Sequence, residues 1–283
     1  MSFLDLRAGC LVLSIAALVL VFSGARSDAL ANEQAWPSQV SASYEITFNG
    51  LKVGGFEFKS STDAAGYALQ SNGKVSVLFG AMKWSSDAEA RGIFSRSQLQ
   101  PRDFSFNLKG PAKAGTTKIA FQGDTVQSVQ MEPPPKVRAD RIPVEPKHLK
   151  GALDPFAAVM TMTKGGGNPC SRTIPVYDGQ RRIDLKLSPQ GQVPLPGAKP
   201  SDVPTTGIVC RVNYALIAGH RPGDETAYMA RNQKIELTFR QVPSANIFVP
   251  YQVRASTLLG DVVVFAKRVS ISNPGKQELV LNH

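Results

Sequence analysis

The sequence predicts an all-β protein, built as a strongly curved antiparallel sheet or incomplete β-barrel with one short helix at about residues 154–164. Strand-like segments with alternating apolar and polar residues recur along most of the chain, which is typical of antiparallel sheet with one buried face. Four dipeptides that favour short hairpin turns separate such segments: Asn49-Gly50, Gly123-Asp124, Asp178-Gly179 and Gly260-Asp261.

The first predicted hairpin spans residues 44–58, YEITFNGLKVGGFEF. A two-residue turn gives three facing pairs on one side of the ribbon: Phe48–Leu51, Ile46–Val53 and Tyr44–Gly55. Phe56 and Phe58 then fall out of this alternation. We therefore expect the strand to bend at Gly54-Gly55, with Tyr44 covering the glycine opposite it, so that the sheet curves around an interior.

The other three turns define further hairpins. Counted as two-residue turns, they give these facing pairs: Phe121–Val126, Ile174–Ile183 and Leu259–Val262. More strands are predicted within residues 83–94, 102–108, 207–217, 234–242 and 246–253. Asn72-Gly73 is compatible with a turn or with one long strand that has a glycine kink.

The single predicted helix begins after Asp154, a good N-cap, with Pro155 at the first helical position, and ends at the glycines 165–167. Phe156 and Met160 lie on its apolar stripe. We expect this stripe to pack in the core and to plug the mouth of the curved sheet.

Two stretches rich in proline interrupt the strand pattern. Residues 131–151 carry five prolines and are expected to form an extended crossover. Residues 188–207 are rich in Pro and Gly and are expected to form a mobile surface excursion. No domain boundary is evident, so residues 32–283 are predicted to form a single β-rich domain.

Residues 1–31 have the features of a signal peptide. Arg7 precedes an apolar run over residues 11–22, and Ala29-Leu30-Ala31 presents the small-x-small pattern that signal peptidase accepts. The run is shorter than the ~20 apolar residues of a spanning helix. We expect a periplasmic protein, cleaved after Ala31 and without a transmembrane span afterwards; an uncleaved anchor is the alternative.

The chain is basic, with a formal net charge of +10. The predicted leader contains two basic and two acidic residues, so the charge stays at 30 − 20 = +10 without it. Such a surface attracts anionic lipid head groups and envelope glycans. No Lys/Arg block with interleaved aromatic residues is present, so nucleic acid is not an expected partner. A solubilising charge excess with no dedicated partner is the alternative.

After removal of the leader two cysteines remain, Cys170 and Cys210. In an oxidising compartment an isolated pair is expected to form one structural disulfide. No metal site is expected, because neither thiol has a histidine at ligand spacing. A catalytic thiol pair would more often have the Cys-x-x-Cys spacing.

Motifs of catalysis are missing from the sequence. It contains no G-x-S-x-G, P-loop, H-E-x-x-H or G-x-G-x-x-G at a helix start, so no catalytic residues, metal or cofactor are predicted. His220 with Asp224 is the one acid–base candidate, against a hydrogen-bonded loop histidine. Arg181 and Arg182 form either a basic rim that binds an anion or a cross-strand charge pattern without function.

Four stretches together resemble the domain-of-unknown-function family 3108 of exported bacterial proteins: YEITFNGLKVGGFEF, HLKGALDPFAAV, PCSRTIPVYDGQRRIDLKL and IFVPYQVRASTLLGDVVV. The resemblance spans most of residues 40–272. It implies an exported β-rich domain akin to the curved sheets and open barrels of lipoprotein-carrier proteins, and it carries over no catalytic residues. The 188–207 insertion and the cysteine pair depart from shorter family members.

These observations favour a non-catalytic periplasmic protein that binds or carries a lipid, an acyl chain or another amphiphile and contributes to envelope maintenance. The alternatives are an envelope interaction protein with a solid core, which binds peptidoglycan, lipopolysaccharide or a protein, and an envelope hydrolase that uses His220. The apolar cavity of the preferred interpretation is predicted to be lined by Tyr44, Ile46, Phe48, Val53, Phe104, Phe106, Phe156, Met160, Ile235, Leu237 and Phe239.

Overall fold

The computed structural model describes residues 36–95, 98–111, 113–197, 199–232 and 234–283. The predicted signal peptide, residues 1–31, and its cleavage site lie outside the described residues.

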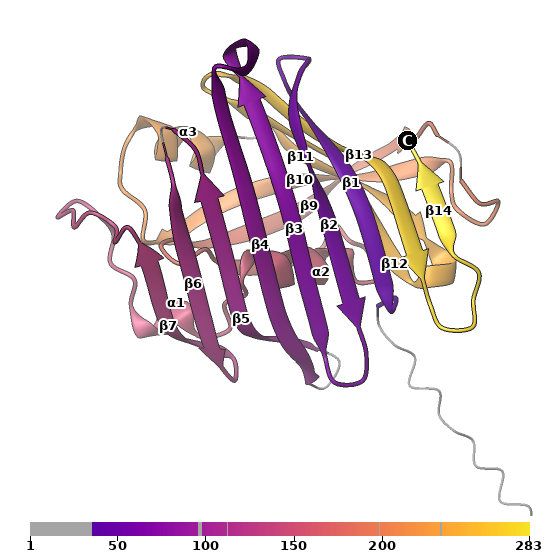
Figure 1. Ribbon diagram of the computed structural model, residues 1–283, viewed down its shortest axis with the longest axis horizontal. Coiled ribbons are helices and arrows are strands. Elements are labelled where there is room, and N and C mark those ends of the chain that lie inside the picture. The colour runs from indigo at the N-terminus through magenta and orange to yellow at the C-terminus, as the bar shows by residue number, and fades with distance from the viewer. Residues whose placement is uncertain (1–35, 96–97, 112, 198, 233) are drawn as a thin grey trace, which may run out of the picture. The chain divides into compact units, whose positions relative to one another are not determined.

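Two meanders of antiparallel strands form the described part of the chain (Figure 1). The first consists of β1 (Gln39–Phe48), β2 (Leu51–Thr62), β3 (Tyr67–Val77), β4 (Met82–Ser95), β5 (Gln98–Lys109), β6 (Gly115–Gln122) and β7 (Thr125–Glu132). The second consists of β8 (Thr173–Tyr177), β9 (Arg182–Pro194), β10 (Thr206–Ala218), β11 (Ile235–Val242), β12 (Ile247–Thr257) and β13 (Gly260–Ser272). A last strand, β14 (Leu279–Asn282), pairs with β13.

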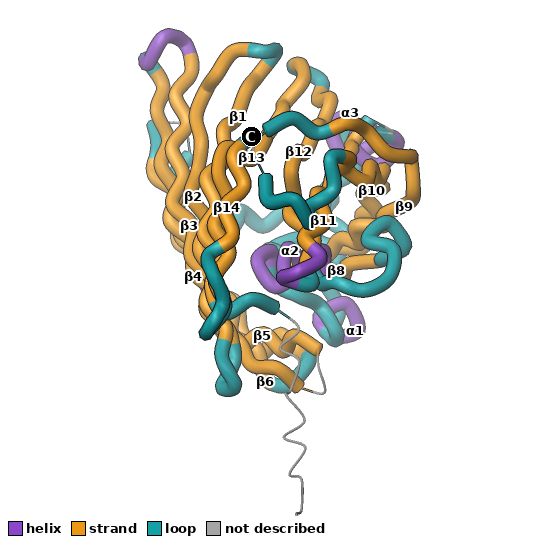
Figure 2. Tube along the Cα trace, turned by 90° about the vertical axis from the view of Figure 1, so that its right-hand side faces the viewer, coloured by secondary structure: helices purple, strands orange, loops and turns teal. Residues whose placement is uncertain are grey.

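Strand β1 pairs with β13 and thereby joins the two meanders into one sheet of 14 strands. Its order is β7-β6-β5-β4-β3-β2-β1-β13-β12-β11-β10-β9-β8. The sheet bends so that the meanders face each other, with helix α2 (Pro155–Thr163) between them (Figure 2). The predicted fold class, a strongly curved antiparallel sheet or incomplete barrel with a short helix, is confirmed.

The first hairpin bends one residue earlier than its sequence pattern predicts. Phe48 lies opposite Leu51 as expected, but a bulge at Val53 places Ile46 opposite Gly54, so the predicted pair Ile46–Val53 is wrong. Tyr44 therefore faces Phe56, and the predicted pairing of Tyr44 with Gly55 is wrong. Because the extra residue is accommodated before the glycines, the aromatic residues of β2 point to the same side as those of β1.

The other turns match the two-residue count only in part. Phe121 faces Val126 as predicted. In the β8–β9 hairpin, Tyr177 faces Arg182, so the loop has four residues and Ile174 lies opposite Leu185 rather than Ile183.

The β12–β13 turn is shifted in the same way. Thr257 pairs with Gly260, which leaves Leu258 and Leu259 as the turn residues in place of the predicted Gly260-Asp261. A Gly-Asp dipeptide thus marks a turn nearby without fixing its two central residues. Asn72-Gly73 lies inside the single long strand β3.

Helix α2 starts as the sequence predicts. The Asp154 carboxylate accepts hydrogen bonds from the backbone N–H groups of Phe156 (2.8 Å) and Ala157 (3.0 Å), and Pro155 occupies the first turn. The helix end is capped by a residue that the sequence did not point to. The Arg172 guanidinium donates to four backbone carbonyl groups at this end: those of Thr161, Met162, Lys164 and Gly166.

Helices α1 (Pro146–Leu149) and α3 (Asp224–Arg231) and the 3-10 turns η1 (Leu78–Gly80) and η2 (Pro243–Ala245) were not predicted. All of them are short. Such elements depend on tertiary contacts more than on local propensity.

A short segment spans the gap between the edge strands β7 and β8. Lys150 forms a bridge with Thr125 at the start of β7, and Leu153 forms a bridge with Val176 of β8. The Leu153 N–H donates to Pro175 O and its carbonyl accepts from Tyr177 N, both at 2.8 Å. We call residues 150–153 the strap, because they bridge the edge strands β7 and β8, which do not pair with each other in the described part of the chain.

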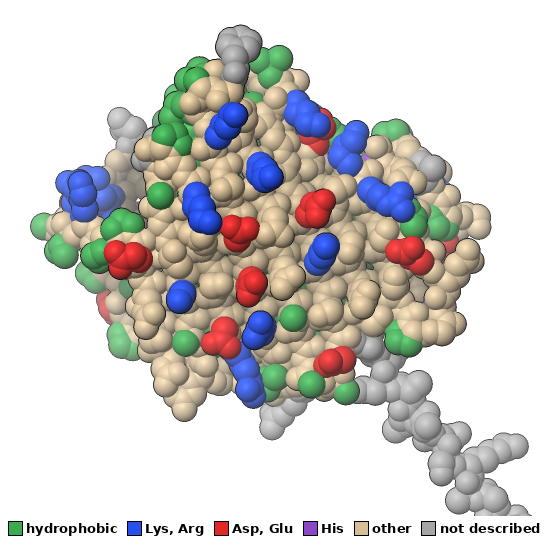
Figure 3. All heavy atoms as spheres, in the orientation of Figure 1, with side chains coloured by type: hydrophobic (Ala, Val, Ile, Leu, Met, Phe, Trp, Pro, Cys, Tyr) green, Lys and Arg blue, Asp and Glu red, His purple; other side chains and the backbone are tan. Residues whose placement is uncertain are grey.

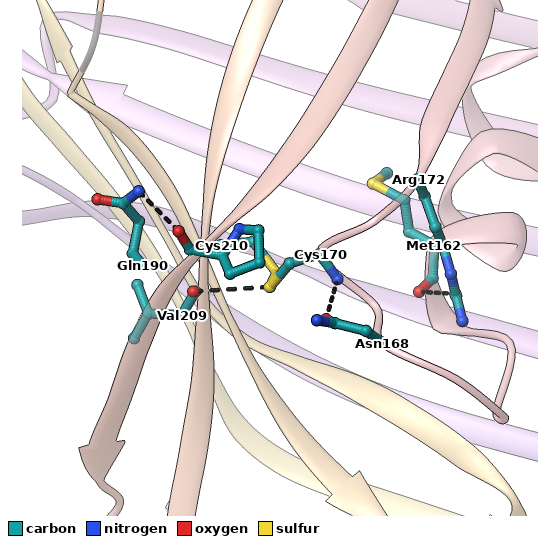
Figure 4. Close-up of a disulfide and its surroundings, with 8 residues drawn as sticks. Met162, Asn168, Cys170, Arg172, Gln190, Val209 and Cys210 are labelled. Atoms are coloured by element: carbon teal, nitrogen blue, oxygen red, sulfur yellow. Dashed lines mark hydrogen bonds between the residues drawn. A yellow bond between two sulfur atoms is a disulfide. The ribbon is translucent and has the colours of Figure 1, made fainter.

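The interior holds two apolar cores, one on each side of α2. One contains Trp36, Leu69, Phe104 and Met160, and the other surrounds a disulfide between Cys170 and Cys210. This confirms the predicted disulfide. Both cysteines are fully buried, and the Cys170 N–H donates to the Asn168 side chain at 2.9 Å (Figure 4). The bond thereby links the segment after α2 to the middle of β10.

The excursion predicted at residues 188–207 is shorter and better packed than its composition indicates. Strand β9 continues to Pro194, and β10 begins at Thr206. In the loop between these strands, Leu195 and Val203 are buried. The Leu195 N–H also donates to Thr205 O at 2.8 Å. The Pro- and Gly-rich stretch is thus a folded loop, because its apolar residues pack against β11.

Candidate functional site

An apolar cavity of about 290 Å³ lies between β1, β2, β12 and α2. Aromatic and aliphatic side chains form nearly all of its wall, among them Tyr44, Phe58, Phe156, Met160 and Phe248. Its volume is at the lower end of the range for small-ligand sites, ~300–1,000 Å³. We call it the inner cavity.

A wider cleft of about 750 Å³ adjoins the inner cavity. Phe56, Ser71 and Phe156 line both spaces, and we call these three side chains the neck. From the neck, the outer cleft passes the inner faces of β3 to β6 and reaches Pro133–Pro135 and the β8–β9 loop.

Aromatic contacts hold the neck in shape. Tyr44 stacks on Phe56 with ring centroids 4.8 Å apart. Phe156 meets Phe58 edge-on at 5.7 Å and Phe104 at 5.9 Å. Tyr44 also donates its hydroxyl to Pro250 O at 3.1 Å, and burial raises the pKa of this hydroxyl. These ring contacts are individually small, but together they fix the width of the neck.

Charged residues lie only in the outer cleft. Its lining includes the cationic residues Lys74, Lys113 and Arg181 and the acidic residues Glu132 and Asp178. Arg181 forms an ion pair with Asp178, with 2.8 Å between Nη2 and Oδ2. The inner cavity has no charged residue in its lining. The combined site is therefore apolar at one end and has a small excess of positive charge at the other.

Asp154 is a buried acid at the start of α2, next to the cleft residue Phe156. It is fully buried, and its Oδ2 atom has no hydrogen-bond partner among the described residues. Burial raises the pKa of Asp154 from 3.8 to about 6, despite the two N–H groups that stabilise the carboxylate. Burial and the nearby Asp154 charge also raise the pKa of Tyr67.

The structure divides the predicted cavity residues among several places. Four line the inner cavity: Tyr44, Phe156, Met160 and Leu237. Three more line the outer cleft, where Phe156 also lies: Ile46, Phe104 and Phe106.

Four predicted residues lie elsewhere. Ile235 and Phe239 pack in the core around the disulfide and are not among the lining residues of the inner cavity. Val53 is displaced by the β2 bulge and lines a groove at the end of β2 to β5. Phe48 faces Leu51 beside the first turn.

The two arginines of the predicted basic rim also separate. Arg181 lines the outer cleft. Arg182 turns back onto its own strand, where it forms an ion pair with Asp184 at 2.5 Å and donates to Ile183 O. Arg181 and Arg182 differ because they are neighbours at the end of the β8–β9 loop, and neighbouring side chains at a strand end point to opposite faces.

Sequence reasoning missed several wall residues, including Trp36, Phe56, Phe58 and Phe248. Phe56 and Phe58 were visible as a break in the alternation, but a bulge placed before the glycines was needed to turn them inward. Trp36 and Phe248 reach the cavity through long-range contacts, such as the bond from Trp36 Nε1 to Met160 O at 3.2 Å.

His220, the predicted acid–base candidate, lies in the loop after β10. Its backbone carbonyl accepts from Ile142 N at 2.9 Å, and its Nδ1 atom is buried without a partner among the described residues. The side chain of Asp224 lies outside what the structure describes. His220 is not among the lining residues of the inner cavity or the outer cleft.

A family model described as "Protein of unknown function (DUF3108)" matches residues 43–267. No match is found among curated proteins. The chain is similar to a solved structure, a β-barrel-like protein of domain of unknown function DUF1849 from Brucella abortus, with 11% identity and a TM-score of 0.48. That similarity covers 84% of this chain and 100% of the other. In the described part of the chain, no helix is long and apolar enough to cross a bilayer.

Proposed function

We propose that this chain, which belongs to the DUF3108 family of proteins of unknown function, is a non-catalytic carrier for a lipid or another amphiphile with one apolar chain and an anionic head. The observation that carries the proposal is the two-part site: an uncharged apolar cavity lies next to a charged cleft, and the neck residues line both.

The inner cavity suits an apolar chain. Transfer of each CH₂ group from water into such a wall is favourable by ~0.8 kcal/mol. The wall consists mainly of Phe, Val, Met and Pro side chains. An apolar ligand also needs no hydrogen-bond partner there.

The outer cleft suits an anionic head group. Lys74 and Lys113 are exposed, while Arg181 is oriented by Asp178. Guanidinium and ammonium groups form charge-assisted hydrogen bonds with carboxylate or phosphate oxygens. With Glu132 and Asp178 included, the lining carries three basic and two acidic residues, so an anion is favoured over a cation.

The same proposal includes the compartment. A buried disulfide persists in an oxidising environment, which supports placement in the periplasm and a role in the maintenance of the cell envelope.

Substitution of Ser71 tests the proposal, because Ser71 lines both spaces at the neck. In Ser71→Phe the larger ring should occupy the neck and lower the affinity for a dansyl-labelled fatty acid about tenfold or more, measured by fluorescence titration. Gln70→Phe is the matched control, since Gln70 is the preceding residue of β3 and is exposed on the opposite face. Urea unfolding of both variants would show whether each retains its fold.

Native mass spectrometry of protein purified from its own cells provides an independent readout. An added mass that is lost on extraction with organic solvent supports a bound amphiphile. A bare polypeptide mass together with no fatty-acid binding by the wild type would refute the carrier function. Equal affinities of Ser71→Phe and Gln70→Phe would show that any binding occurs outside the site.

A further inference from the structure

Four leucines are exposed on three hairpin turns at one end of the sheet. Their exposed fractions are 73% for Leu51, 67% for Leu78, 59% for Leu258 and 85% for Leu259. Hydrophobic side chains gather at this end in the space-filling view (Figure 3). Single exposed leucines are common, but several on adjacent loops form an apolar surface that marks an interaction site.

The three turns lie side by side. In the sheet, the hairpins β12–β13, β1–β2 and β3–β4 are consecutive, and both ribbon views place their turns at the same end (Figures 1 and 2). The first two turns are also joined directly. Asn49 N–H donates to Asp261 O, and Asp261 N–H donates to Asn49 Oδ1, both at 2.8 Å. The turns that carry Leu51, Leu258 and Leu259 are therefore held together.

Leu78 is unfavourable for folding in two respects. It is exposed, and its backbone has a φ of +52°, in the left-handed region that a bulky side chain rarely adopts. Such a conformation costs on the order of 1 kcal/mol or more and is concentrated at functional sites. The fold itself gains nothing from a leucine at this turn, where glycine or asparagine would be the unstrained choice.

A cationic groove adjoins the leucines. Lys74, Lys83 and Lys109 line it together with Trp84, and no acidic residue is among its lining residues. All three lysines are exposed. Two acids near the leucine turns are already engaged: Glu45 pairs with Lys52 at 2.6 Å, and Asp261 accepts from the Ser256 hydroxyl at 2.7 Å. We call the four leucines and the three lysines the tip face.

We infer that the tip face docks on the surface of an anionic lipid bilayer. Leucines at the ends of turns can enter the boundary between head groups and acyl chains, while lysines set back along the strands meet the head-group charges. Tryptophan beside them is typical of the membrane interface. The separation into projecting leucines and a group of lysines on β3 to β5 matches the layered chemistry of a bilayer.

Docking in this orientation would place the outer cleft at the membrane. Lys74, Val75, Trp84 and Ser85 line both the cationic groove and the outer cleft. An amphiphile could then pass between bilayer and cleft with little exposure to water. Membrane docking itself goes beyond the proposed carrier function and does not require a ligand in the cleft.

Flotation with lipid vesicles tests the inference. The full protein is expected to bind vesicles of phosphatidylcholine and phosphatidylglycerol, and to bind pure phosphatidylcholine vesicles far more weakly, with loss of binding at high salt. Leu258→Ser combined with Leu259→Ser should lower the partition coefficient about hundredfold, or ~tenfold for each leucine. Replacement of the three lysines by Gln should lower it about hundredfold, or ~fivefold for each lysine.

Matched controls separate the tip face from general properties. Val193→Ser removes an apolar side chain that is 39% exposed near the far end of β9. A second control replaces three exposed lysines on other strands by Gln: Lys59, Lys118 and Lys267. Val193→Ser should bind vesicles within about twofold of the wild type. The control lysine variant should bind them more tightly than the tip-face lysine variant. Urea unfolding confirms that each variant is folded.

Three results would overturn the inference: no flotation of the wild type, equal loss in the tip-face and control lysine variants, or wild-type binding by the double leucine variant. Self-association of the wild type that disappears in the double leucine variant, without vesicle binding, would identify the tip face as a protein contact instead. Fatty-acid titration without vesicles reports separately on the carrier function, so the failure of one proposal is distinguishable from that of the other.

Discussion

Substitution of Asp154 by asparagine should change the pH dependence of stability in a defined direction. The side chain of Asp154 is fully buried at the start of α2 and caps the helix through Oδ1. Asparagine keeps a carbonyl oxygen that can accept the same two hydrogen bonds, since it is also a good N-cap residue. The substitution therefore removes the titrating group while it preserves the cap.

The sign follows from the raised pKa. The unfolded chain releases the Asp154 proton near pH 3.8, and the folded protein releases it at about pH 6. Between these values the folded state binds more protons, so protonation stabilises it. This contribution is fully present below pH 3.8 and is lost as the pH rises through 6. A separation of about two pH units corresponds to ~3 kcal/mol at 1.36 kcal/mol per unit.

Urea unfolding of the wild type and Asp154→Asn at pH 4, 5, 6 and 7, followed by tryptophan fluorescence, measures this effect. The free energy of unfolding of the variant minus that of the wild type should rise by ~2.4 kcal/mol between pH 4 and pH 7, because a part of the full effect lies outside this range. Other acids titrate equally in both proteins and cancel in the difference. A difference that stays constant would refute the raised pKa. A difference that falls with pH would show that the helix N–H groups outweigh burial.

Three further substitutions test how the fold is held together. Loss of the disulfide in Cys170→Ser combined with Cys210→Ser should lower the free energy of unfolding by about 4 kcal/mol, because the bond closes a loop across a sequence separation of 40 residues. A decrease smaller than ~1 kcal/mol in urea unfolding would contradict this entropic argument. Arg172→Met leaves four carbonyl groups at the end of α2 without their donor and should cost about 2–3 kcal/mol, with partial recovery in Arg172→Lys. Equal thermal midpoints of the two Arg172 variants and the wild type would show that water replaces this cap. Gly54→Ala places a Cβ atom against the Lys74 carbonyl oxygen at the β2 bulge, and a loss of about 1–3 kcal/mol is expected in urea unfolding. Unchanged stability would mean that the bulge adjusts.

The local rules of the sequence predicted much of this fold. Asn49-Gly50 marks a true two-residue turn, and Asp154 with Pro155 marks the start of the helix, since these residues act on their immediate neighbours. The Gly260-Asp261 turn was misplaced because the turn residues are the apolar Leu258 and Leu259, which no turn preference selects. The more typical turn dipeptide beside these leucines therefore led to the wrong prediction of the turn residues.

The site could be predicted only where strand parity is regular. Phe104 and Phe106 line the outer cleft on the face that alternation indicates, because β5 alternates without interruption in this region. Phe56 was missed, because a bulge changes which face every later residue of a strand occupies. Ile235 and Phe239 face inward as alternation predicts, but the sequence does not reveal that α2 divides the interior into two cores.

The pairing of β1 with β13 has a consequence for how the chain matures. The first meander consists of strands that are neighbours in sequence and can assemble as it is synthesised. Its edge strand β1 can pair with β13 only after residues 260–272 have been synthesised. Until then β1 presents unpaired backbone groups, the arrangement that invites pairing with another molecule. This pairing joins the strands that are farthest apart in sequence, closes the longest loop and should set the rate of maturation. Truncation just before β13 would therefore leave a species prone to aggregation rather than a smaller stable domain.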